Sequence, residues 1–145
     1  MNIIEFFDQN WQLQKWQQGF SKRERTLLTG LSGTAKSLVM ANAYENVADK
    51  YIIVTDSQFH ANELYDELST LLGEEKVFQF FSDDNIYAEF ALASKDRVAY
   101  RLEALNFLLD EKSTGFLVVP FLALRSYLPS PENFLENYLL LTSGD

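Results

Sequence analysis

The residues from Gly30 to Ser37 form the stretch of this sequence whose residue types and spacing could do chemistry. They read Gly-Leu-Ser-Gly-Thr-Ala-Lys-Ser and follow the apolar pair Leu27 and Leu28. The order is close to G-x-x-x-x-G-K-[ST], a loop between a strand and a helix that binds phosphate. In such a loop, backbone N–H groups surround the β-phosphate, the lysine neutralises phosphate charge and the hydroxyl holds Mg²⁺. The candidate phosphate-binding residues are Gly30, Gly33, Thr34, Lys36 and Ser37.

Ala35 departs from this pattern, because it stands where the template has its second glycine. If the backbone must take a positive φ at this position, alanine costs about 1 to 2 kcal/mol relative to glycine. A cost of that size weakens phosphate binding roughly tenfold or more without abolishing it. The loop could therefore be a working nucleotide site or an inherited junction that no longer binds nucleotide.

ATP hydrolysis also needs an acidic residue that ends a later strand and holds the metal ion. Asp56 follows the β-branched run Tyr51–Thr55, but it can equally cap the helix that comes next, and we favour capping. The apolar run Phe116–Val119 ends at Pro120 without an acid. We therefore expect no catalytic residue in this chain and interpret the phosphate loop as vestigial and empty.

Metal binding is also not expected. His60 is the only histidine, and the chain has no cysteine. Without thiolates or a second imidazole, the usual zinc ligand sets cannot be assembled. The lack of cysteine also excludes a disulfide framework and agrees with a reducing compartment.

The charge of the chain is acidic and unevenly spread. The net charge is −9, with +1 on residues 1–50 and −10 on residues 51–145. An acidic body opposes the counterion release that drives binding to a nucleic-acid backbone, so autonomous DNA binding is disfavoured. No apolar run approaches the roughly 18 residues needed to cross a membrane, and the first residues lack a signal-peptide pattern. We expect a cytoplasmic protein with no membrane partner.

Apolar patterning predicts strands and helices that alternate along the chain. The expected strands are Thr26–Thr29, Tyr51–Thr55, Val77–Phe81 and Phe116–Val119. The expected helices are Asn2–Phe20, Lys36–Val47, a segment capped by Asp56 and Ser57 that ends at Gly73, Asp96–Asp110 and Glu132–Asn137. This alternation predicts an α/β fold, a parallel sheet flanked by helices on both faces. The Gly30 loop should then lie at the edge of the sheet where such folds bind ligands.

The domain organisation follows from the same pattern. Residues 1–24 are expected to form an N-terminal helix and linker, and residues 25–137 an α/β domain, which the resemblance described below implies to be a degenerate helicase-like one. Residues 138–145 resemble the first strand of a hairpin without its second half. We expect them to begin a following, truncated domain, so that the chain is the N-terminal part of a longer protein.

Four segments, taken in order, resemble the N-terminal UvrB-like module (the domain 1a region) of the transcription-repair coupling factor (Mfd) family. They are LTGLSGTAKSLVMANAY, YIIVTDSQFHANELYDEL, KDRVAYRLEALNFLL and GFLVVPFLALRSYLP. The likeness covers about residues 25 to 145 and extends to the first domain of the excision-repair protein UvrB. It implies a RecA/P-loop helicase-like fold that has lost ATPase function. Gly30, Gly33, Thr34, Lys36 and Ser37 match the active loop of UvrB-like proteins, whereas Ala35 departs from it.

The resemblance also implies what this segment would and would not bind. No cofactor is expected here, since ATP and Mg²⁺ would act in motor domains elsewhere in the parent protein. The domain that follows would present the surface for UvrA and pack against the motor to keep it autoinhibited, while RNA polymerase and DNA would be reached only through other domains. The connection Ser82–Ala93 is shorter than the DNA-clamping hairpin region of UvrB, which puts clamping in doubt. The alternative is a small P-loop nucleotide-binding ATPase that tolerates Ala35.

Overall fold

The computed structural model describes residues 10–22, 24–81 and 95–137. Its centre is a parallel three-stranded sheet in the order β1-β3-β2. The strands are β1 (Lys50–Thr55), β2 (Val77–Gln79) and β3 (Gly115–Pro120). Because β3 lies between the other two strands, all six of its residues are buried. The predicted α/β class with a parallel sheet is confirmed.

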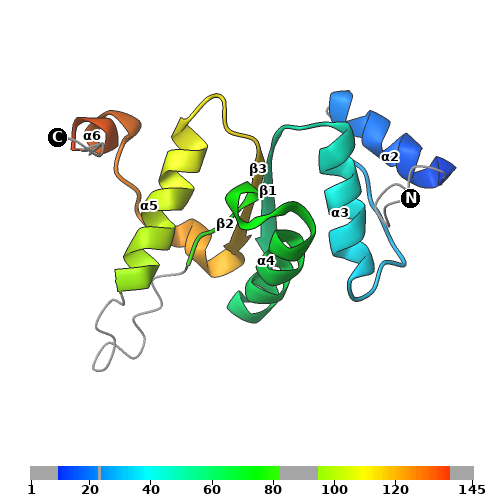
Figure 1. Cartoon of the computed structure of the whole chain (residues 1–145), viewed down its shortest axis with the longest axis horizontal. Coiled ribbons are helices and arrows are strands. Elements are labelled where there is room, and N and C mark those ends of the chain that lie inside the picture. Colours follow the sequence, from blue (N-terminus) through cyan, green and yellow to red (C-terminus); the bar gives the residue numbers. More distant parts are fainter. Residues whose placement is uncertain (1–9, 23, 82–94, 138–145) are drawn as a thin grey trace.

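Helices of different length connect and flank the strands (Figure 1). They are α2 (Trp11–Ser21), α3 (Ala35–Asn46), α4 (Gln58–Leu72), α5 (Lys95–Leu109) and α6 (Pro131–Glu136). Two 3₁₀ turns, η2 (Glu74–Lys76) and η4 (Phe121–Arg125), stand before β2 and after β3. None of the helices in the described ranges is long and apolar enough to cross a membrane.

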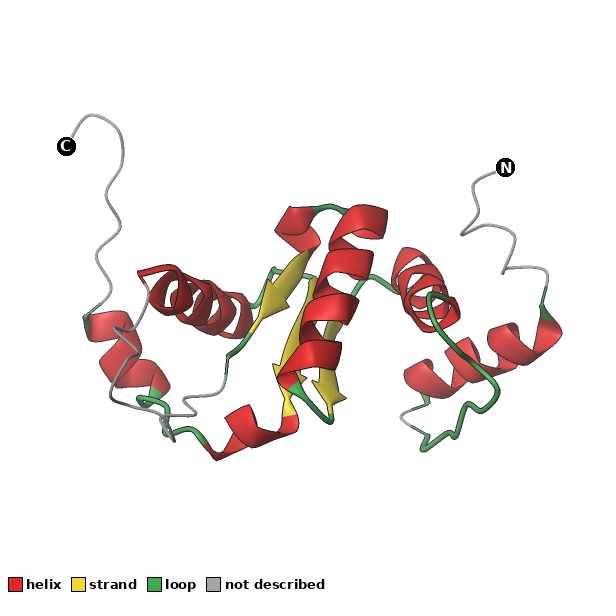
Figure 2. Ribbon diagram, turned by 90° about the horizontal axis from the view of Figure 1, so that it is seen from below, coloured by secondary structure: helices red, strands yellow, loops and turns green. Residues whose placement is uncertain are grey.

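The sheet separates two apolar clusters, as the period-2 alternation of a strand requires. Phe116 and Val118 of β3 pack with residues of α3 and α4, including Tyr44 and Leu68. Their neighbours Leu117 and Val119 face the other way and pack with α5 and η4. Figure 2 shows the strands lying between helices. Helices on both faces of the sheet are therefore confirmed.

The predicted boundaries of α4 are confirmed by local hydrogen bonding. Ser57 has extended backbone and its hydroxyl accepts from the His60 N–H at 3.2 Å, as an N-cap does. Gly73 ends the helix with a φ of 97°, and its N–H donates to the Ser69 carbonyl.

The other predicted helices and strands that fall in the described ranges agree to within two residues, except for the first strand and the first helix. The continuous helix predicted for Asn2–Phe20 is wrong at Asn10, which is not helical; its side chain accepts from the Gln12 N–H at 2.9 Å, and α2 begins at Trp11.

The prediction of a strand at Thr26–Thr29 is wrong. Residues 24–29 have no regular secondary structure, and the Leu27 side chain is 88% exposed. Only two residues of the segment, Leu27 and Leu28, are aliphatic, so it offers little apolar surface to bury on a sheet. The phosphate-loop pattern therefore lacks the strand that should lead into it.

Several predicted features lie outside the described residues. These are the start of the helix predicted for Asn2–Phe20, the connection Ser82–Ala93 and the truncated domain at 138–145. The division of the chain into three parts accordingly stays a prediction.

Candidate functional site

The candidate site is the loop that leads into α3. Gly30 and Gly33 take left-handed backbone angles, with φ of 84° and 53°. The Ala35 N–H donates to the Ser32 carbonyl and the Lys36 N–H to the Gly33 carbonyl, both at 3.3 Å. These two donors are therefore used inside the loop, whereas a phosphate loop turns such donors toward its ligand.

Ala35 is the first residue of α3 and has helical backbone. The penalty expected for alanine applies only to a positive φ, so it does not arise here. Alanine has the highest helix propensity of all residues and suits this position. The cost that alanine would carry at a positive φ therefore does not apply to Ala35 in this structure.

Glu67 of α4 binds two of the three hydroxyl groups of the loop, those of Thr34 and Ser37. Thr34 Oγ1 donates to Glu67 Oε1 at 3.2 Å, and Ser37 Oγ donates a short hydrogen bond to Glu67 Oε2. The Ser37 residue is fully buried. In a working phosphate loop this hydroxyl would hold Mg²⁺ beside the phosphates. Here a carboxylate of the protein itself is its partner.

A cleft of about 490 Å³ opens beside the loop between β1, α3 and α4. Its charged or titratable lining residues are Lys36, Asp56, His60, Glu63 and Glu67. Three carboxylates therefore face one lysine, so the cleft disfavours a polyphosphate electrostatically. Gly33 and Lys36 line the cleft, while Thr34 and Ser37 reach one of its lining residues, Glu67. Gly30 is not among the residues that line it.

Asp56 follows the last residue of β1, and its side chain makes hydrogen bonds with residues at the start of α4. Its Oδ1 is 2.5 Å from His60 Nδ1, and it accepts from the Ser57 hydroxyl at 3.2 Å. These hydrogen bonds, chiefly the one from His60, lower the pKa of the fully exposed Asp56 carboxyl. The N-cap of α4 is Ser57, so the interpretation of Asp56 as the cap is wrong: its described side-chain bonds go to the His60 ring and the Ser57 hydroxyl and not to a backbone N–H of the helix. Within the described ranges, no group of three or more His, Asp or Glu side chains is arranged to hold a metal ion.

Glu67 was missed by sequence reasoning. It lies three residues after Leu64 and four before Leu71, both of which pack against the core, so it stands at the border of the apolar face of α4. That position was the available signal, because an acidic side chain beside an apolar face lies close to the elements that the face packs against. Its actual partners come from a segment 30 residues earlier.

The fold and this loop define the class of the chain: an α/β domain with a phosphate-loop-like junction, two of whose hydroxyls are bound by an internal carboxylate. The architecture is consistent with a RecA- or UvrB-like helicase domain. No family model matches the chain, and no solved structure matches it.

Sequence relatives identify the family more closely. The transcription-repair-coupling factor of Bacillus subtilis (strain 168) is 33% identical over 119 residues, which is 81% of this chain. The factor of the same name from Staphylococcus aureus (strain bovine RF122 / ET3-1) is 27% identical over 120 residues, or 83% of this chain. The chain is thus a relative of the transcription-repair-coupling factors. It spans about 10% of the length of each of these two curated relatives.

Proposed function

We propose that this chain is a non-catalytic, UvrB-like N-terminal module of a transcription-repair-coupling factor. Such a factor is a DNA-repair protein that displaces stalled RNA polymerase and recruits the excision-repair machinery. The proposal that the module is non-catalytic rests on one observation: Glu67 binds the hydroxyl groups of Thr34 and Ser37. The relatives named above support the choice of parent protein.

The chemistry of the loop supports the proposed lack of turnover. Binding of Mg²⁺–ATP would require the Ser37 hydroxyl to leave Glu67, and the freed carboxylate would then face the incoming phosphates. Like charges at such short range oppose each other strongly in a partly buried cleft. Asp56, the one acid at the end of β1, is hydrogen-bonded to His60 and Ser57.

The proposed role is that of a scaffold for recruitment of UvrA and for restraint of the motor domains. UvrA would be reached through the segment that follows residue 137, and RNA polymerase and DNA through other domains. Exposed apolar side chains on η4 support packing against further parts of a longer protein, since Phe121, Leu122 and Leu124 are each about half exposed or more. ATP and Mg²⁺ would be cofactors of the motor alone.

Size-exclusion chromatography with UvrA tests the scaffold role. The chain of 145 residues is expected to elute separately from UvrA, whereas a longer form that includes the following domain is expected to co-elute with it. Removal of the module from the longer protein should raise the ATPase rate of the motor. A stable complex between UvrA and the short chain, or an unchanged motor rate, would contradict the proposal.

The alternative is a small P-loop ATPase, and one observation favours it. Ala35 is unstrained, and the exposed Lys36 lines the cleft, so the lysine can still reach a phosphate. This alternative predicts an ATPase activity that Lys36→Ala abolishes. It is excluded if the chain shows no ATPase activity above a heat-treated control.

A further inference from the structure

A second cavity, of about 520 Å³, lies away from the loop, between α4, η2, β2 and α5. Its walls contain the aromatic rings of Tyr65, Phe78 and Tyr100, and its charged lining residues are Glu74, Glu75 and Glu103. Among the residues that the structure describes, no lysine, arginine or histidine lines it. The cavity therefore combines aromatic surfaces with negative charge.

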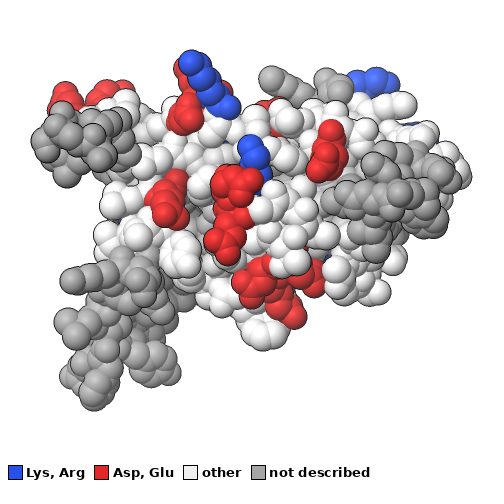
Figure 3. Space-filling view, viewed as in Figure 1, with Lys and Arg blue, Asp and Glu red and all other residues white. Residues whose placement is uncertain are grey.

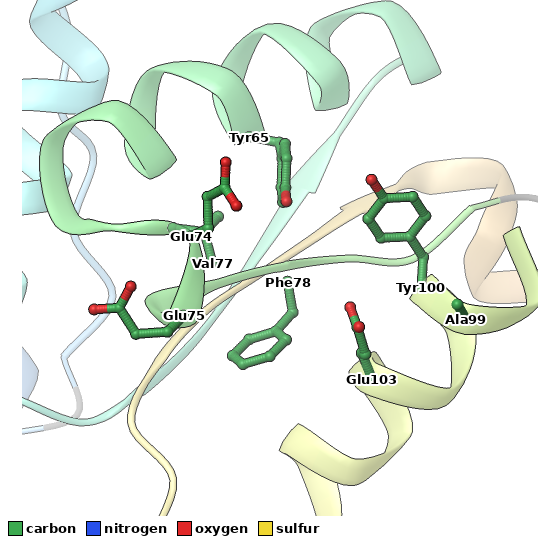
Figure 4. Close-up of a pocket in the computed structure, with 8 residues that line it drawn as sticks. All are labelled: Tyr65, Glu74, Glu75, Val77, Phe78, Ala99, Tyr100 and Glu103. Carbon is green, nitrogen blue, oxygen red and sulfur yellow. The ribbon is translucent and has the colours of Figure 1, made fainter. Parts of the chain in front are cut away.

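The aromatic walls are held in place by packing. Phe78 stacks on Phe107 of α5, with ring centroids 4.5 Å apart and planes 23° apart. Tyr65 of α4 and Tyr100 of α5 meet edge to face, with centroids 6.4 Å apart. In Figure 4 the Tyr65 and Tyr100 side chains point toward one another from α4 and α5. Rings fixed in this way offer their π surfaces to a ligand at little entropic cost.

The carboxylates come from both sides of the cavity. In Figure 4, Glu103 rises from α5 toward the space between the tyrosine rings, and Glu74 lies beside Tyr65. Within the described part of the chain, no Lys, Arg or His forms an ion pair with the glutamates of this cavity. Burial raises the pKa of Tyr65, and the nearby carboxylates of Glu74 and Glu103 add to this rise.

We infer that this cavity binds an arginine side chain presented by a protein partner. A guanidinium group stacks on aromatic faces and donates paired hydrogen bonds to carboxylates, which are the two features that the cavity supplies together. A lysine ammonium is a more strongly hydrated point charge and cannot use a planar stacking surface in the same way.

Charge around the cavity supports a basic partner. Figure 3 shows mainly acidic side chains over this face of the described chain, with few basic ones among them. Residues 51–145, which contain the whole cavity lining, carry a net charge of −10. An acidic face raises the encounter rate with a basic surface and repels DNA. The inference goes beyond the proposed function, because it holds for any parent protein.

An NMR titration of the 145-residue chain with acetyl-Gly-Arg-Gly-amide tests the inference. Saturable shifts are expected at the amides of Tyr65, Tyr100 and Glu103, with a dissociation constant on the order of 1 mM for one side chain. The peptide with citrulline in place of arginine has nearly the same shape without the charge. It is expected to bind at least tenfold more weakly, and the lysine peptide at least threefold more weakly.

Variants locate the site on the protein. Glu103→Gln is expected to weaken binding of the arginine peptide severalfold, while Glu111→Gln, which removes an exposed glutamate outside the cavity lining, is expected to leave it unchanged. Tyr100→Phe, which keeps the ring, should retain most of the affinity, and Tyr100→Leu should not. Absent binding, equal binding of the citrulline or lysine peptide, or equal loss in both glutamate variants would overturn the inference.

Discussion

Glu67→Ala tests the contact between α4 and the loop most sharply. The substitution removes the acceptor of two hydroxyl groups, one of which, on Ser37, is fully buried. A buried hydroxyl left without a partner costs about 1 to 3 kcal/mol, and the bond from the exposed Thr34 adds little. The free energy of unfolding should fall by about 1 to 3 kcal/mol, measured by urea denaturation followed by circular dichroism.

Two further variants show whether the loss comes from this contact. Glu63→Ala removes a carboxylate from the same cleft, and the described hydrogen bonds of the loop do not involve it, so its effect should stay within about 0.5 kcal/mol. Ser37→Ala removes the buried hydroxyl that Glu67→Ala alone would leave without a partner. The double variant should therefore be more stable than the sum of the two single losses predicts. Additive losses, or equal losses at Glu63 and Glu67, would refute the reasoning.

Two other predictions concern single positions. Gly115 has a φ of 147°, and a Cβ there would lie 2.2 Å from the Lys76 carbonyl oxygen, so Gly115→Ala should cost about 3 kcal/mol or more in urea denaturation. Gly30→Ala, where an added Cβ meets nothing within 4 Å, should cost only about 1 to 2 kcal/mol; equal costs would contradict the structure. His60→Ala should raise the Asp56 pKa toward its ordinary value of 3.8 in a ¹³C NMR titration. An unchanged Asp56 pKa would contradict the bond between Asp56 and His60. Because the pKa of Asp56 is lower in the folded state, its contribution to stability is complete above its unfolded-state pKa and is lost as the pH falls through its folded-state pKa.

Elements with local signals were predictable from the sequence. α4 has a capping serine, leucines at helical spacing and a terminal glycine, and all three act as expected. β3 is a continuous apolar run between turn residues, which is typical of a strand buried on both faces, and it is the central strand. These signals suffice because neighbouring residues decide the backbone conformation in each case.

Features that depend on distant contacts were not predictable. In α5, Val98 and Leu102 stand at helical spacing with Leu105, and only Leu105 is buried, while the other two are nearly half exposed. Ala104 and Phe107 complete the buried face, and Phe107 stacks on Phe78 of β2. The contact of Glu67 with the loop is of the same kind, since it joins two helices that are separated in sequence by a strand.

The strand predicted at Thr26–Thr29 failed for a related reason. The motif that suggested it describes a strand, a loop and a helix together. Local interactions stabilise only the loop and the helix: the loop has glycines with positive φ, and hydrogen bonds form at the start of α3. A strand of four residues needs a neighbour to bind, and the sequence around Leu27 and Leu28 does not specify one.

Isothermal titration of the 145-residue chain with ATP and Mg²⁺ tests the central claim most directly. If Glu67 keeps its hydrogen bonds with Thr34 and Ser37 and so blocks the loop, no saturable heat of binding is expected up to about 1 mM nucleotide. The Lys36→Ala variant should then give the same titration trace as the unmodified chain. Micromolar binding that is lost in Lys36→Ala, together with measurable turnover, would contradict the account and favour a nucleotide-hydrolysing enzyme.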